Sequence, residues 1–130
     1  MADIEKWSNE KPQEAYNLRS QVYALMGNFP DALKEINKAL EENYSVKNLF
    51  NRGMIRYSMK LYKTALEDFN AIVTDSLNFA EAYYFRGNCK FKLNDLDGAC
   101  IDWNKTKELG KAIASKEIEY NCLKNMNSDQ

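Results

Sequence analysis

The 130-residue sequence contains no histidine. Histidine is the commonest general base and metal ligand in proteins, so its absence counts against catalytic and metal-binding roles. Only two prolines and five glycines occur, which favours long helices joined by short turns. No apolar run approaches the ~20 residues of a membrane-spanning helix, and the amino-terminal residues lack the apolar segment of a signal peptide. We therefore expect a cytoplasmic protein without membrane insertion, unless a leader has been removed.

Cysteine and charge patterns are equally plain. The three cysteines, Cys89, Cys100 and Cys122, are odd in number and lack CxxC spacing, so we expect buried or half-buried free thiols and neither a disulfide nor a metal site. No histidine is present to activate one of them as a nucleophile, which argues against an enzyme, and no motif implies a cofactor. The net charge is −1 and the basic residues are scattered, a pattern that argues against nucleic acid as a partner.

The chain repeats itself. Residues 13–45, 46–79 and 80–110 align with offsets of 33 and then 34 residues, and several columns of the alignment agree. Two of these columns are small, one is mostly large and apolar, and one is basic. They are Ser20, Gly53 and Gly87; Ala32, Ala65 and Ala99; Ile36, Phe69 and Trp103; and Arg19, Arg52 and Arg86.

Each unit is predicted to form two helices. In the second repeat, apolar side chains recur every three or four residues along two runs that meet near Lys60 and Leu61. In the first repeat, Gly27 is suited to close one helix and Pro30 to open the next. The small columns let the two helices of a unit approach closely, so we interpret Gly87 as a packing residue. The three units together predict six helices in three antiparallel pairs.

A two-helix unit of this length, with small residues at its eighth and twentieth positions, resembles the tetratricopeptide repeat (TPR). Large residues stand at the fourth and seventeenth positions, as Tyr16 and Tyr83 and as Phe29 and Tyr62 do here. Ser20 departs from the pattern, as do the basic residues at the eleventh position of the second and third repeats. The proline expected between repeats is also absent. The resemblance implies an all-α, right-handed superhelical stack (an α-solenoid) of about seven helices. It divides the chain into a tail (1–11), three repeats within 12–110, a capping helix (111–125) and a disordered tail (126–130).

The two ends of the stack differ. The predicted capping helix is apolar on one side at Ala114, Ile118 and Cys122, and on another at Ile113, Tyr120 and Leu123, so its surplus side is suited to face a second copy. The first repeat has no such cap. Either Trp7 folds back over it, or the array continues in another chain, or upstream repeats are missing from the sequence.

The resemblance also implies a function, because the first helices of TPR units line a concave groove that binds protein partners. We expect a non-catalytic scaffold or interaction module that binds a peptide or helix of a partner of unknown identity. The predicted groove residues are Asn17, Gln21, Phe50, Asn51, Met54, Tyr57, Tyr84, Asn88 and Phe91. For Tyr57 and Phe91, packing between neighbouring helices is the competing interpretation. The alternative function is a self-associating structural protein, a homodimer for example, that uses the uncapped amino-terminal face or the last helix.

One well-known use of the family is a clamp for the terminal carboxylate of chaperones. It needs lysine, asparagine and arginine at positions that this sequence fills with Asn17, Gln21, Asn51, Glu81 and Phe85. Only Asn51 fits and Glu81 would repel a carboxylate, so we reject this function.

Each arginine of the basic column is followed sixteen residues later by an acid, Glu35, Asp68 or Asp102. A row of arginines would suit an anion, but a structural ion pair explains the constant offset better, because the arginine fork matches a carboxylate. The asparagine column, Asn37, Asn70 and Asn104, is interpreted as a set of structural hydrogen bonds to a neighbouring turn, in preference to ligand contacts.

Overall fold

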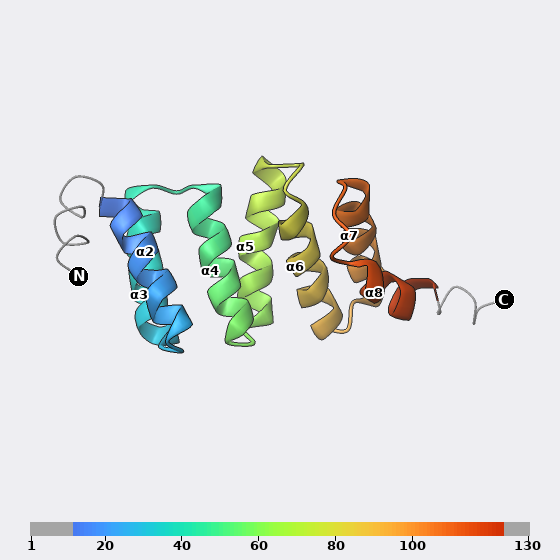
Figure 1. The fold of residues 1–130 in the computed structure, drawn as a ribbon, viewed down its shortest axis with the longest axis horizontal. Coiled ribbons are helices and arrows are strands. Elements are labelled where there is room, and N and C mark those ends of the chain that lie inside the picture. Colours follow the sequence, from blue (N-terminus) through green and yellow to red (C-terminus); the bar gives the residue numbers. More distant parts are fainter. Residues whose placement is uncertain (1–11, 124–130) are drawn as a thin grey trace. The chain divides into compact units, whose positions relative to one another are not determined.

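The computed structural model describes residues 12–123, and the regular elements of this part of the chain are all helices, without strands (Figure 1). Six α-helices are followed by a short terminal helical segment, which confirms the all-α prediction and the number of helices. Their bounds are α2 (Pro12–Leu25), α3 (Phe29–Glu42), α4 (Val46–Ser58), α5 (Tyr62–Asp75), α6 (Ala80–Lys92), α7 (Leu96–Glu108), α8 (Ser115–Glu117) and η1 (Ile118–Leu123). None of these helices has the length and apolarity needed to cross a membrane. Trp7 and the tail 126–130 lie outside the described residues.

The chain divides into two compact units, Met1–Leu61 and Tyr62–Gln130. In the first, α2 and α3 pack as a pair and α4 packs on α3 (Figure 1). The side chain of Asn28 accepts a hydrogen bond from the Asp31 N–H at the start of α3, and Ser45 caps α4 in the same way. Apolar side chains of α3 and α4 then form one core, in which Ile36, Ala39 and Ile55 are buried.

In the second unit, α6 pairs with α7 and α5 packs on α6. The small column explains how closely α6 and α7 approach. A Cβ built on Gly87 would lie 2.8 Å from Cδ1 and Nε1 of Trp103 and 3.2 Å from the carbonyl oxygen of Ala99. A side chain of any size would therefore collide with the largest residue in the core, and the interpretation of Gly87 as a packing residue is confirmed.

The end of the chain differs from the expected single capping helix. Regular helix begins only at Ser115, and after one turn it becomes the six-residue π-helix η1. We call residues 115–123 the terminal segment. It packs on α7, where Ile118 and Cys122 join Ala99 and Trp103 in a core cluster, while Tyr120 and Leu123 stay exposed.

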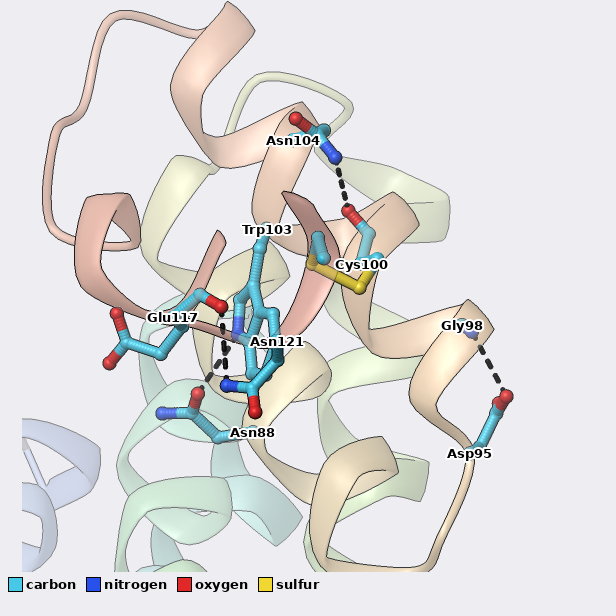
Figure 2. Close-up of a disulfide and its surroundings, with 9 residues drawn as sticks. Asn88, Asp95, Gly98, Cys100, Trp103, Asn104, Glu117 and Asn121 are labelled. Carbon is cyan, nitrogen blue, oxygen red and sulfur yellow. Dashed lines mark hydrogen bonds between the residues drawn. A yellow bond between two sulfur atoms is a disulfide. The ribbon is translucent and has the colours of Figure 1, made fainter. Parts of the chain in front are cut away.

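One expectation about the cysteines is wrong. Cys100 on α7 and Cys122 in the terminal segment form a disulfide, with their Cα atoms 5.8 Å apart (Figure 2). Their separation of 22 positions hides this proximity in the sequence, because the chain must turn back on α7 before the two side chains meet. Cys89 is a free thiol, as expected, and burial raises its pKa to about 12.

Candidate functional site

Two neighbouring pockets open on α2 and α4, the first helices of the first two repeats. One has a volume of about 340 Å³ and is largely apolar, with Leu25, Phe29 and Ile55 among its lining residues. The other, of about 290 Å³, is lined by Asn17, Gln21, Lys47, Phe50, Asn51 and Met54. Gln21, Asn51 and Met54 border both. Five of the predicted groove residues, Asn17, Gln21, Phe50, Asn51 and Met54, therefore lie around one hollowed surface.

A chain of amides forms the floor of this surface. Asn17 donates to Oδ1 of the fully buried Asn48 at 2.5 Å, and the Oδ1 of Asn17 accepts from Nε2 of Gln21 at 2.5 Å. Nδ2 of Asn51 reaches across from α4 to the hydroxyl of Ser20 at 2.8 Å. The network fixes the side chains of α2 against those of α4, since each buried amide must find a partner. Asn48 was not identified from the sequence. A polar residue on the apolar side of a helix could have indicated a buried hydrogen-bond network.

These contacts divide the roles of the predicted residues. Asn17 is only 3% exposed and its amide is committed to the network, so it shapes the floor of the pocket. Gln21 is exposed at the rim, and Phe50 and Met54 are half-buried beside it. Tyr57 is also half-buried on α4, but it lines neither pocket. An exposed amide beside an aromatic ring and a methionine is a composition that interface centres favour.

On α6, the corresponding positions are occupied by other parts of the second unit. The hydroxyl of Tyr84 donates to Oε1 of Glu117 in the terminal segment at 2.7 Å. Oδ1 of Asn88 accepts from the indole N–H of Trp103 at 3.0 Å, as the close-up shows (Figure 2). The ring of Phe91 lies 5.7 Å from that of Trp103 but is still 39% exposed. Trp103 and the terminal segment thus engage the α6 residues that were predicted to bind a partner.

The structure brings together two of the three arginine–acid pairs. Nε of Arg19 lies 3.2 Å from Glu35, and Arg86 makes a two-pronged contact with Asp102 at 2.8 and 2.6 Å. The hydrogen bonds to Asp102 raise the pKa of Arg86 above its ordinary value. Lys90 also contacts Asp102, at 3.1 Å, a partner that the sixteen-residue offset did not reveal. Arg52 and Asp68 belong to different units, and their pairing stays a prediction.

The asparagine column differs from its interpretation. Asn37 accepts a hydrogen bond from Arg52 at 3.0 Å and Asn70 accepts one from Arg86 at 3.2 Å, so both bind an arginine and not a turn. Asn104 instead donates to the carbonyl of Cys100 in its own helix. The column therefore makes structural hydrogen bonds, and the partner that recurs is an arginine side chain of the next helix.

Comparison with known proteins identifies the fold. No family model matches the sequence. The Sgt2 TPR domain from Aspergillus fumigatus superimposes with a TM-score of 0.81 at 16% identity, over 92% of this chain and 82% of that one. The chain is a tetratricopeptide-repeat protein. The first TPR of Spaghetti (RPAP3), solved with the HSP90 peptide SRMEEVD, superimposes with a TM-score of 0.78 at 23% identity, over 82% of this TPR chain and 87% of that one.

Curated relatives match the sequence over part of their own length. The RNA polymerase II-associated protein 3 of Xenopus tropicalis is 30% identical over 88 residues, which are 67% of this TPR chain and 13% of the relative. Across the curated relatives that it matches, the chain spans only 13% to 25% of their length.

Proposed function

We propose that this TPR chain is a non-catalytic interaction module that binds an extended segment of a partner protein on the surface formed by α2 and α4. The observation that supports the proposal is the pair of neighbouring pockets that share Gln21, Asn51 and Met54. The larger pocket has the apolar lining that accommodates a hydrophobic side chain of the partner. The exposed amide of Gln21 is suited to hydrogen-bond the partner's backbone.

The ligand is not expected to be held by its terminal carboxylate. The relative RPAP3 is described with an HSP90 peptide that ends in aspartate, and this makes SRMEEVD a useful probe. Among the described residues, Lys47 is the one cation that lines the smaller pocket, and the positions that hold cations in the carboxylate clamp carry Asn17, Glu81 and Phe85 here. We expect SRMEEVD and its carboxyl-amidated form to bind equally weakly. A marked preference for the free carboxylate would contradict the rejection of the clamp.

A peptide selection followed by calorimetry tests the module itself. Peptides are selected from a random library on the full chain, and the affinity of the best one is measured with the wild type, with Phe50→Ala and with Tyr44→Ala. Phe50 borders the smaller pocket, whereas Tyr44 is an exposed aromatic residue of the same unit that lines neither pocket. We expect Phe50→Ala to weaken binding by about tenfold or more, as truncation of an aromatic anchor does, and Tyr44→Ala to leave it unchanged. Equal loss in both variants, or in neither, would move the binding surface away from α2 and α4.

A further inference from the structure

The outward face of α2 carries apolar side chains that no described helix covers. Leu18 is 37% exposed, Val22 40%, Leu25 89% and Met26 72%. Leu18, Val22, Leu25 and Met26 succeed one another at helical spacings, so they share one side of the helix. The repeat alignment shows what kind of element would cover the first two of these side chains.

In each later repeat, one of the two positions held by Leu18 and Val22 packs on the preceding helix. Ile55, the equivalent of Val22, is buried in the core cluster with Ile36 and Ala39 of α3. Phe85, the equivalent of Leu18, stacks on Phe69 of α5 with ring centroids 6.1 Å apart. In both cases a first helix rests on the large residue at the twenty-fourth position of the repeat before it. The face of α2 is therefore an interface that lacks its second half within the described chain.

The chain also contains the missing half, on α7. Trp103 stands at the twenty-fourth position of the last repeat, as Ile36 and Phe69 do in the first two. The terminal segment occupies this surface, with Ile118 and Cys122 packed against Trp103 and Ala99. The terminal segment therefore stands where the first helix of a fourth repeat would lie.

The terminal segment is a poor substitute for a regular helix. It has only one turn of α-helix before it becomes a π-helix, a geometry that is rare and that occurs mostly at functional sites. Within the described part of the chain, Oε2 of Glu117 is buried without a hydrogen-bond partner, which is costly for a carboxylate oxygen. By contrast, α2 has fourteen residues of regular helix. The disulfide between Cys122 and Cys100 holds the terminal segment in place covalently.

We propose that α2 docks on α7 of a second copy of this chain, and that reduction of the Cys100–Cys122 disulfide opens the docking surface. A dithiol supplies the two electrons. One of its thiolates attacks one sulfur of the disulfide and forms a mixed disulfide with that cysteine. The other cysteine leaves as a thiolate and takes up a proton. The second thiolate of the reductant then displaces the first cysteine, leaving two protein thiols and the reductant as a cyclic disulfide. Buried Cys89 takes no part, since its thiol stays protonated at neutral pH.

Such an association joins the start of one chain to the end of another, so it is heterologous and continues beyond a dimer. Leu25 borders the larger pocket, but the test does not depend on the peptide-binding proposal, because Leu18 and Val22 line neither of the two pockets. The two proposals therefore fail separately.

Light scattering on a gel-filtration column tests this proposal with the full chain at a series of concentrations. The oxidised protein is expected to show the mass of one chain, and the dithiothreitol-treated protein a mass that increases with concentration. Cys122→Ser should associate without reductant. Adding Val22→Glu or Leu18→Glu to Cys122→Ser should restore the single-chain mass. The matched control, Ile101→Glu, changes an apolar residue of α7 that is 69% exposed and should leave the association intact.

Circular dichroism first establishes that each variant keeps its helix content. A single-chain mass for reduced protein and for Cys122→Ser at every concentration would overturn the proposal, and would leave residues 1–11 or another protein to cover α2. Continued association of both glutamate variants would also overturn it, and would point to the exposed face of the terminal segment at Tyr120 and Leu123.

Discussion

The same repeat positions have opposite roles in the two units. In the first unit, the residues of α2 and α4 border two open pockets, and Gln21 at their rim is exposed. In the second unit, Tyr84 and Asn88 of α6 are engaged by Glu117 and Trp103. In the third repeat, its own second helix and the segment that follows it engage the first helix, which becomes an interface and not an open surface. A position within the repeat is therefore not enough to assign a binding residue.

The arginine–acid pairs differ between the units in the same way. The Glu35 side chain is 14% exposed and makes one close contact, with Arg19. Nζ of Lys38 lies 3.9 Å from its other carboxylate oxygen. The Asp102 side chain is 1% exposed and is held by both Arg86 and Lys90. Removal of a carboxylate leaves its cations without a partner, and the cost increases with burial. The second pair is therefore the more sensitive of the two.

The largest predicted effect comes from Asp102→Ala. We expect it to lower the free energy of unfolding by about 3 kcal/mol, because two cations then remain inside the second unit without their carboxylate. The matched change in the first unit, Glu35→Ala, should cost about 1 kcal/mol, since its pair is less buried. Urea unfolding followed by circular dichroism measures both. Equal losses would mean that burial does not distinguish the two pairs.

A smaller effect is expected at the close approach of α6 and α7. Gly87→Ala should lower the free energy of unfolding by about 2 kcal/mol, because its Cβ meets the indole ring of Trp103. The first unit has Ser20 and Ile36 at these two positions, so it tolerates a side chain where the second does not.

A double-mutant cycle measures this coupling. In a Trp103→Ile background, which copies the first unit, Gly87→Ala should cost little, since the smaller side chain leaves room for the added methyl group. The same loss in both backgrounds would show that the indole ring is not the cause, and would leave the contact with the carbonyl of Ala99 as the alternative.

How much of this could be predicted from the sequence depended on the range of each interaction. Helices, junctions and the small column at Gly87 come from local periodicity and from the repeat, and the structure confirms them. The pairing of Arg86 with Asp102 comes from a constant offset, which a repeat preserves. The amide network around Asn48 required the register of α2 on α4. A sequence pattern does not contain this register.

The end of the chain was the least predictable part, for a physical reason. The aligned repeats end at residue 110, so no alignment column shows where the terminal segment lies. Its change from α-helix to π-helix and the pairing of Cys100 with Cys122 depend on how it fits over Trp103. The predicted groove residue Tyr84 was affected too, because its partner, Glu117, belongs to that segment.

The smallest predicted effect compares the turns that end the first helices of the repeats. Gly27, Lys60 and Asn94 all have left-handed backbones, with φ of 77°, 64° and 69°. Each turn closes with the same two backbone hydrogen bonds. One of the two joins the N–H of Asn28 to the carbonyl of Tyr23 in the first turn, and its equivalent in the second turn joins the N–H of Leu61 to the carbonyl of Arg56. Lysine is strained in this conformation, whereas glycine is not and asparagine is only mildly so.

Lys60→Gly should therefore raise the free energy of unfolding by about 0.5 kcal/mol, the relief of strain being partly offset by the greater freedom of glycine in the unfolded chain. Asn94→Gly in the second unit should change it by no more than a few tenths of a kcal/mol, because asparagine already accepts a positive φ. Lys60→Ala is the control, since it removes the charge and keeps the strain, and it should give no gain. Thermal melts of the three variants separate these outcomes. A gain from alanine equal to that from glycine would attribute the effect to the lysine side chain and not to the backbone.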